Sequence, residues 1–335
     1  MVAICFREGA VATNSCVYEK RRIGFGNKHG EIILWGAKMI MDTCKVTLLS
    51  VMVIAWSFYY ILDGSLITAM QSPYLVGLLL RLGTFLTMTV VFILSKRLKW
   101  VFRSWKGFTR AFLVATVAFL FDFLINVGLQ YSSASSGTAL LKTEILFVFL
   151  LDAFIRKKHL NAIEYILSIL MAVGVFLIVA GERSTFDIWS ILFVISAMLN
   201  SFSAFGIKKI QADYSIDSYQ IAYFNNIVSL ILYAIVAALF VEGSPFAQLG
   251  NLNLCQLLLC VLCQTLLMLT YYKALQITQV WIVKVVQLAI PILTILIQFF
   301  FYGEALGIIQ YIGITLSLMS ALFLIMKSYT GTASD

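Results

Sequence analysis

Charged residues are scarce in this sequence. Asp, Glu, Lys and Arg together make up 12% of the 335 residues, whereas 61% are hydrophobic. Soluble domains average about 25% charged and about 45–50% apolar residues. A soluble core could not bury so much apolar surface, so the composition excludes an ordinary soluble domain and predicts that lipid surrounds most of the chain.

Patterns typical of enzymes and metal proteins are also lacking. There is no Walker loop and no HExxH, and the two histidines, His29 and His159, lie outside the apolar stretches. Of the six cysteines, Cys255, Cys260 and Cys263 share one apolar stretch that has no second CxxC and no nearby histidine pair. We therefore expect small buried thiols, no disulfide framework, no metal site, no cofactor and no enzymatic activity.

What the sequence does contain is long apolar runs. Windows of about 20 residues, the length that crosses a bilayer, recur ten times, near 46–65, 73–95, 108–130, 136–155, 161–181, 186–207, 217–241, 254–275, 279–301 and 307–326. The segment before the first window is polar and basic, without the apolar core of a signal peptide. The sequence predicts an all-α integral membrane protein with ten transmembrane helices.

Lysine and arginine are distributed unevenly between the loops. If the N-terminal end is cytoplasmic, twenty of the 24 Lys and Arg residues fall on the cytoplasmic side, and only Arg183 falls on the other. The remaining three, Arg81, Lys142 and Lys284, lie inside windows. This bias follows the positive-inside rule and predicts both chain ends in the cytoplasm. The net charge of +8 is then a topology signal, and no nucleic-acid partner is expected.

An internal repeat divides the windows into two sets of five. When the sequence is shifted onto itself so that Leu129-Gln130 lies on Leu275-Gln276, the following apolar runs coincide. The alternative is a chance match of leucine-rich segments. Because five is odd, the second set would be inserted upside down, which predicts two inverted five-helix repeats, typical of alternating-access carriers. The expected parts are a cytoplasmic segment 1–45, repeats 46–181 and 186–327, and a cytoplasmic tail 328–335.

The second-half stretch "PILTILIQFFFYGEALGIIQYIGITLSLMSALFLI" resembles the signature of the drug/metabolite transporter superfamily. In that signature a proline-containing apolar helix ends in Gly-Glu, and a glutamine and a glycine follow. The matching residues, in order, are Pro291, Gly303, Glu304, Gln310 and Gly313. The equivalent first-half stretch departs from it at 156–159, where Gly-Glu is missing. The resemblance covers about residues 47–326 and implies an EamA-type carrier.

Polar side chains inside apolar windows are costly and are often functional. The candidate substrate-binding residues are Asp122, Asn126, Lys142, Glu144, Asn200, Tyr223, Asn225, Asn226, Lys284 and Gln287. We expect them to converge on one polar cavity between windows three, four, six, seven, eight and nine. Each has a structural alternative: asparagines hold helices together, tyrosines pack, and Arg81 pairs with Asp122 or Asp63.

Lys142 and Lys284 come from windows that correspond under the repeat. We expect both to face a water-filled cavity and to bind an anionic or carboxylate-bearing solute; the alternative is a structural ion pair with Glu144 or Asp122. Residues two apart differ by about 200° around a helix, so Lys142 and Glu144 are not expected to share a narrow face. Glu144 and Asp122 are candidates for a coupling proton.

A second resemblance is to nucleotide-sugar transporters, a branch of the same superfamily with Phe-Tyr-Asn-Asn in the seventh helix and lysines in the fourth and ninth. This chain has "YFNN" at 223–226, with Lys142 and Lys284 in those helices. The resemblance implies that the lysines neutralise phosphates and the asparagines contact base or sugar. Two aromatic residues are transposed, however, and the family's Gly-Ala-x-Asn is replaced by "QVWIVK".

The expected function is therefore secondary-active transport of a small, anionic or carboxylate-bearing organic metabolite, by export or exchange. The alternative is a Golgi or endoplasmic reticulum antiporter of nucleotide sugar and nucleotide monophosphate; an intramembrane enzyme and a membrane receptor or scaffold are further classes. The expected partners are a small-molecule substrate and the lipid bilayer, and a homodimer is left open. We expect the plasma membrane, or the Golgi or endoplasmic reticulum membrane for the nucleotide-sugar branch.

Overall fold

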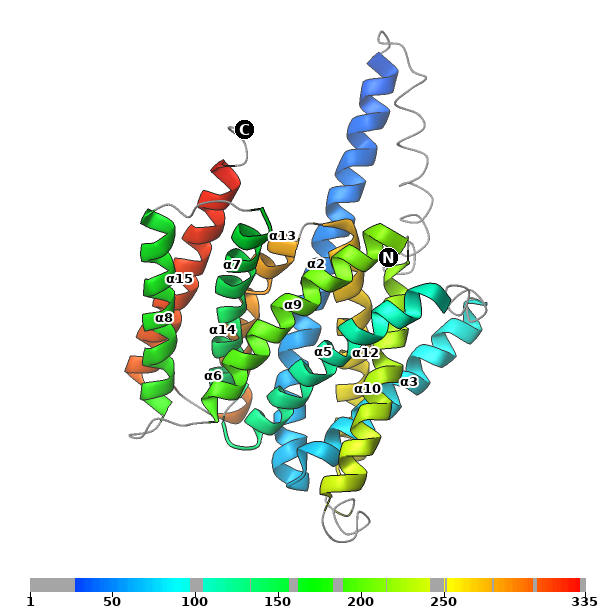
Figure 1. Ribbon diagram of the computed structural model, residues 1–335, viewed down its shortest axis with the longest axis vertical. Helices are drawn as coiled ribbons and strands as arrows, with labels where there is room; N and C mark the ends of the chain where they lie inside the picture. Colours follow the sequence, from blue (N-terminus) through cyan, green and yellow to red (C-terminus); the bar gives the residue numbers. More distant parts are fainter. Residues whose placement is uncertain are drawn as a thin grey trace. The chain divides into compact units, whose positions relative to one another are not determined.

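The fold is that of a computed structural model, which describes residues 28–96, 105–132, 134–156, 162–182, 189–214, 216–241, 250, 252–278, 280–303 and 306–331. Every element in these ranges is a helix, as Figure 1 shows. Four predicted features lie wholly or partly outside them: the part of segment 1–45 that precedes Lys28, most of the departure at 156–159, Glu304, and the end of the tail.

The helices of the first half are α2 (Lys28–Met70), α3 (Pro73–Leu94), α5 (Trp105–Leu129), α6 (Ala134–Leu140), the 3₁₀ turn η1 (Leu141–Thr143), α7 (Glu144–Arg156) and α8 (Ala162–Glu182). Those of the second half are α9 (Ser190–Tyr214), α10 (Ser218–Phe240), α12 (Leu254–Ile277), α13 (Val280–Val286), α14 (Ala289–Tyr302) and α15 (Ile308–Gly331).

The chain divides into two compact units, Met1–Ser50 and Val51–Asp335. The described part of the first unit is the beginning of α2, which is helical from Lys28. The second unit holds the rest of α2 and all the other helices, and with them every residue predicted for the substrate site.

The helix bounds repeat with the shift found in the sequence. The shift that places Leu129 on Leu275 also places both ends of α6 on those of α13, and the first residue of α8 on that of α15. Under this shift α10 is the counterpart of α3, α12 of α5 and α15 of α8. The contacts repeat as well, because α3 packs against α12 and α10 packs against α5. The counterparts α3 and α10 also contact each other, and so do α8 and α15. A chance match of leucine-rich segments would not align the helix ends.

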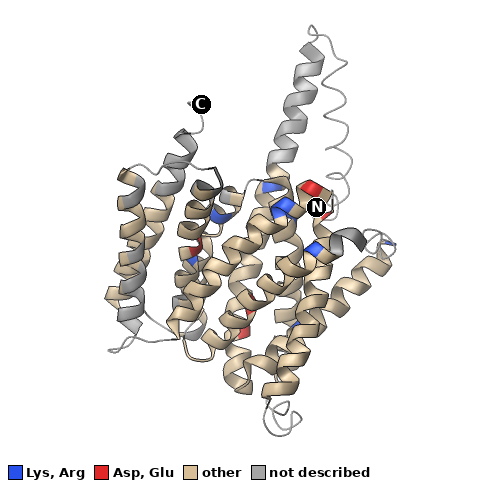
Figure 2. Cartoon of the chain, viewed as in Figure 1, with Lys and Arg blue, Asp and Glu red and all other residues tan. Residues whose placement is uncertain are grey.

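The second unit encloses ionisable side chains within its apolar core and exposes large apolar side chains, unlike a soluble protein. Ionisable side chains are enclosed, with Asp63 0%, Glu144 1% and Lys284 1% exposed, whereas Phe154 is 83% and Phe301 77% exposed. Large exposed apolar faces are unstable in water and stable in lipid. In Figure 2 most blue residues of this unit lie toward its upper end, and the lower ends of the long helices are tan.

Helix breaks occur at equivalent places in the two halves. Pro291 cannot donate the backbone hydrogen bond to the carbonyl of Gln287, and its ring crowds that carbonyl. The helix is therefore interrupted between α13 and α14. The first half has no proline at the equivalent position. The helix there is interrupted by the tighter 3₁₀ turn η1, in which the Thr143 hydroxyl donates to the Leu140 carbonyl at 2.9 Å. Short 3₁₀ stretches within helices often mark hinges.

The prediction of ten spans is not confirmed. Seven helices in the described residues are long and apolar enough to cross a membrane, and 308–323 in α15 is a shorter apolar helix. The fourth predicted span is interrupted by η1, which separates α6 from α7. An unbroken apolar window predicts an unbroken helix there, because apolarity alone does not reveal a change of helical pitch.

At Gly174, α8 and α15 approach each other closely. A Cβ atom at Gly174 would lie 2.7 Å from the Gly313 carbonyl oxygen and 2.7 Å from the Ser317 backbone nitrogen. Backbone atoms cannot move aside as a flexible side chain does, so Gly174→Ala is expected to lower the free energy of unfolding by about 1–3 kcal/mol. Thermal unfolding in detergent measures this. Gly64→Ala is the control, since its Cβ would meet Leu129 at an ordinary 3.7 Å; equal melting temperatures would contradict the packing.

Candidate substrate site

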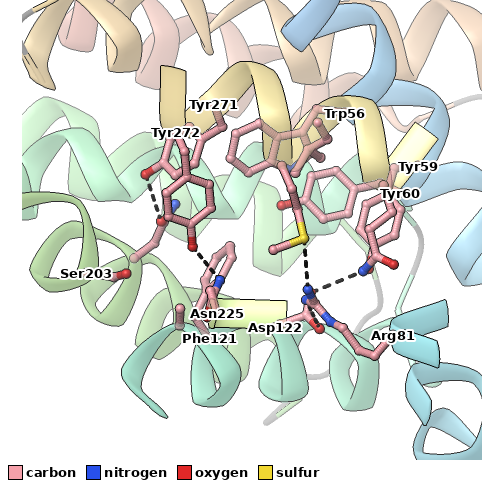
Figure 3. A pocket seen from close by; sticks show the side chains of 15 residues that line it. Trp56, Tyr59, Tyr60, Arg81, Phe121, Asp122, Ser203, Asn225, Tyr271 and Tyr272 are labelled. Carbon is pink, nitrogen blue, oxygen red and sulfur yellow. Dashed lines mark hydrogen bonds and ion pairs between the residues drawn. The ribbon is translucent and has the colours of Figure 1, made fainter. Parts of the chain in front are cut away.

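A cavity of about 60 Å³ lies among α2, α3, α5, α9, α10 and α12. Much of its wall is aromatic, with Trp56, Tyr59 and Tyr60 from α2 and Tyr271 and Tyr272 from α12 (Figure 3). Polar groups are contributed by Arg81, Asp122, Asn200, Ser203, Asn225 and Gln264. An aromatic wall with a few convergent polar groups is the usual construction of a small-molecule site.

The polar group on one side of the cavity is an ion pair. Arg81 Nη2 lies 2.6 Å from Asp122 Oδ2, and the Tyr233 hydroxyl donates to the same oxygen at 2.9 Å. The Tyr59 hydroxyl donates to Asp122 Oδ1 at 3.4 Å, and Arg81 Nη1 also reaches Met268 Sδ at 3.4 Å. Of the two partners considered for Arg81, Asp122 is the one that it contacts.

A second buried cluster joins both lysines to one carboxylate. Lys142 Nζ lies 3.2 Å from Glu144 Oε1, Lys284 Nζ lies 2.8 Å from Oε2, and these side chains are at most 4% exposed. Asn200 Nδ2 donates to Glu144 Oε2 at 2.6 Å, and Lys284 Nζ lies 5.4 Å from the centre of the Tyr271 ring. Two ammonium groups and one carboxylate carry a net charge of +1.

The two lysines do not face the cavity. Neither they nor Glu144 are among its lining residues. Asn200 connects the two places, because it lines the cavity, donates to Glu144 and accepts a hydrogen bond of 3.5 Å from the Tyr271 hydroxyl. The lysine–glutamate cluster therefore lies behind the cavity wall and is joined to it by the hydrogen bond from Asn200 to Glu144. Both lysines form an ion pair with Glu144, the alternative to facing the cavity that was considered from the sequence.

The prediction that Lys142 and Glu144 cannot share a face was wrong. It assumed a regular helix, in which residues two apart differ by about 200°. Lys142 lies in η1 and Glu144 begins α7, and this change of helical pitch brings their side chains to 3.2 Å. The Ser201 hydroxyl donates to the Glu144 carbonyl at 3.0 Å and fixes the start of α7 against α9.

The "YFNN" stretch of α10 points in more than one direction. Asn225 lines the cavity and donates to the Tyr272 hydroxyl. Asn226 Nδ2 instead donates to the Arg81 carbonyl at 3.2 Å, and the Tyr223 hydroxyl lies 2.9 Å from Thr89 Oγ1. Only Asn225 of the three predicted residues lies at the cavity.

The two remaining predicted residues are buried away from the cavity. In the amide orientation that satisfies its neighbours, Asn126 donates to Asp63 Oδ2 at 3.1 Å and accepts from the Tyr233 hydroxyl at 3.2 Å. Gln287 is 0% exposed at the turn between α13 and α14, and within the described residues its side-chain nitrogen and oxygen have no hydrogen-bond partner. Asp63, which accepts the hydrogen bond from Asn126, is itself 0% exposed.

Comparison with known proteins gives the family. The model of the EamA-like transporter family matches residues 44–180 and again 187–326, so that two copies cover most of the sequence. The chain belongs to the EamA-like transporter family. The resemblance to the drug/metabolite transporter superfamily is thereby confirmed, and with it a multi-pass membrane protein of a transporter class.

Solved structures share the fold of this chain. Among 28 matching chains is one described only as "Crystal structure of protein", with a TM-score of 0.58 and 13% identity over 83% of this chain and 95% of that chain. Identity this low carries information on the fold alone. A search of curated proteins found no match.

Several residues at the cavity were not predicted from the sequence. The predicted wall included windows four and nine but omitted the first two, which supply Trp56, Tyr59 and Tyr60 from α2 and Arg81 from α3. An intramembrane arginine is a signal of function, and Arg81 could have placed α3 at the site. The adjacent tyrosines in α2 have no comparable signal, because aromatic residues are frequent throughout the sequence.

Lys208 fixes the end of α12, the helix before the α13 segment that carries Lys284. Its ammonium group donates to the carbonyls of Leu275 at 2.8 Å and Thr278 at 2.6 Å. Because these hydrogen bonds are charge-assisted and only partly buried, Lys208→Met is expected to lower the free energy of unfolding by about 1–2 kcal/mol. The matched control is Lys209→Met, whose side chain is exposed. Equal unfolding of the two variants in a thermal assay would contradict this role.

Proposed function

We propose that the chain is a secondary-active carrier that moves a small monoanionic metabolite, by export or exchange, through alternating access. The observation that carries the proposal is the buried lysine–glutamate cluster, in which two ammonium groups face one carboxylate. A monoanion placed against Lys142 and Lys284 brings this cluster to neutrality. A neutral or cationic solute would leave the excess charge uncompensated in a low-dielectric region.

Access to the lysines requires a rearrangement of the cavity wall. Asn200 and Tyr271 stand between the cavity and the cluster, linked by a hydrogen bond of 3.5 Å. We propose that the solute enters the aromatic cavity, displaces Asn200 from Glu144, and binds the ammonium groups with its carboxylate or an equivalent anionic group. Gln287 lies close to Lys284 in the sequence, is buried, and has no side-chain hydrogen-bond partner among the described residues. Its amide group supplies a further hydrogen-bond donor and acceptor for the solute.

Alternating access requires two arrangements of the repeats around this site. We propose that the two repeats each contain five membrane-crossing segments and have opposite orientations in the bilayer, as the odd number dictates. The paired helix breaks at η1 and at Gln287 support this proposal, because carriers of this design bind solutes at discontinuous helices near the midplane. Rocking about these breaks would expose the lysines to each side in turn.

The nucleotide-sugar alternative fits less well. It draws on "YFNN", of which only Asn225 lines the cavity. A nucleotide monophosphate carries close to two negative charges, more than the single positive charge of the cluster. The monoanion is therefore the better match.

The test is counterflow into proteoliposomes with charge-matched sets of labelled solutes. Each set contains a monocarboxylate, its neutral amide and its amine, and a nucleotide sugar with its monophosphate is run in parallel. We expect exchange of one or more monocarboxylates and none of the corresponding amides. Exchange of amines alone, or of the nucleotide pair alone, would contradict the proposal.

A further inference from the structure

Asp63 is a buried carboxyl group to which the proposed transport cycle assigns no role. It lies on α2, is 0% exposed, and forms no ion pair among the described residues. Its Oδ1 atom has no hydrogen-bond partner there, while Oδ2 accepts a hydrogen bond from the amide of Asn126 at 3.1 Å. An ionised carboxylate in this position would be poorly compensated.

The charges around Asp63 do not balance if every group is ionised. Arg81 on α3 is the cation of the region, and its guanidinium is paired with Asp122 of α5 at 2.6 Å. The other titratable groups that face Asp63 are Tyr59 and Tyr60 on its own helix, Tyr233 on α10 and Cys260 on α12. None of these is a cation, so one guanidinium faces two carboxyl groups. A buried carboxylate without a cation is neutralised by a proton rather than kept ionised.

Asn126 and Tyr233 connect Asp63 to the cavity. The single hydroxyl proton of Tyr233 faces two acceptors, Asp122 Oδ2 at 2.9 Å and the Asn126 amide oxygen at 3.2 Å. When the Asn126 amide group donates to Asp63, its oxygen is available to Tyr233. If Asp63 instead donates its own proton to that oxygen, the amide reverses and gives up its hydrogen bond of 3.1 Å to the Asp122 backbone carbonyl, and Tyr233 is left with the Asp122 carboxylate alone.

We propose that Asp63 is the proton-binding group that couples this carrier to a proton gradient. In one state its carboxylate takes up a proton from the aqueous side to which the carrier is open, forming an O–H bond; in the other it returns that proton to water. Asn126 and Tyr233 transmit the protonation state to the Arg81–Asp122 pair in the cavity wall. This inference rests on the proposed transport function but names a site separate from the lysines.

Infrared spectroscopy of the purified protein tests the proton site without any solute. A protonated buried carboxyl group gives a C=O stretching band that is absent from a carboxylate. We expect such a band in wild type that Asp63→Asn removes and that Asp213→Asn, the control at an exposed site, leaves unchanged. If Asp63→Asn does not fold, Asp63→Glu should fold and displace the band. A band that survives both changes would overturn the assignment.

Transport then tests the coupling. In proteoliposomes, Asp63→Asn is expected to retain counterflow of the monocarboxylate found active in wild type, and to lose about tenfold or more of the accumulation driven by a pH gradient. Accumulation equal to that of wild type would refute the coupling role, and so would accumulation driven by a sodium gradient at equal pH. Absence of counterflow in wild type would instead refute the proposed transport function, leaving the infrared result to decide the proton site.

Discussion

Replacing Glu144 by Gln is expected to destabilise the protein more than replacing either lysine that contacts it. The carboxylate lies within 3.2 Å of Lys142 and 2.8 Å of Lys284, and all three side chains are nearly unexposed. Glu144→Gln leaves two buried ammonium groups facing each other without an anion. Breaking a buried ion pair in this way costs about 3–5 kcal/mol, which should appear as a large loss of folded protein and of melting temperature.

The lysine variants differ because they leave a neutral pair. In Lys142→Met, Glu144 remains bound to Lys284 and the charges cancel, so only a small loss of stability is expected. The double variant Glu144→Gln/Lys142→Met restores the original net charge of one and should recover part of the stability lost in Glu144→Gln. If Lys142→Met unfolds as readily as Glu144→Gln, the charge of the cluster does not determine its stability.

The second large effect is expected at the cavity wall. Arg81→Met removes the guanidinium that lies 2.6 Å from Asp122 and leaves that carboxylate with hydroxyl donors alone. The expected cost is again about 3–5 kcal/mol, measured by thermal unfolding of the purified protein.

A compensating change separates the charge effect from lost packing. Asp122→Asn in the Arg81→Met background removes the unpaired charge, so the double variant should be more stable than Arg81→Met alone. Asp122→Asn by itself should also destabilise, because it isolates Arg81. Additive losses in the double variant would show that the two side chains contribute through packing rather than through their ion pair.

The fold could be predicted from the sequence to the level of helices and repeats. The apolar windows located the long helices to within a few residues at α3, α10 and α12, because lipid imposes one length and one polarity on a spanning helix. The shift that matches the two halves of the sequence also relates the ends of α6 to those of α13. Loop charge predicts an orientation that a cysteine-labelling experiment can test.

The site was predicted less completely, for identifiable physical reasons. Buried charge identified Lys142, Glu144 and Lys284 as special, since such residues are too costly to be incidental. Their contact depends on η1, a local tightening that no periodicity in the sequence reveals. The helix break in the second half could in principle be predicted from Pro291. The hydrogen-bond or ion-pair partner of each polar side chain, however, depends on how the helices pack.

The aromatic part of the cavity illustrates the same limit. The same cavity is lined by Tyr59 and Tyr60 from α2 and by Tyr271 and Tyr272 from α12, although nothing in their spacing distinguishes them from tyrosines that only pack. Tyr223, which the "YFNN" motif suggests, contacts Thr89 on α3 instead. Local sequence therefore indicated which side chains are polar and buried, whereas the arrangement of the helices determines which of them share a site.

Binding of one monocarboxylate to wild type and to the Lys142→Met and Lys284→Met variants tests the central claim most directly. The solute is the one that exchanges best in counterflow, the measurement is titration calorimetry on purified protein, and Lys209→Met is the control at an exposed lysine. If the two buried lysines hold the anion, both Met variants remain folded and lose about tenfold or more in affinity, while the control binds as wild type. Folded Met variants that bind the monocarboxylate with unchanged affinity would contradict the account.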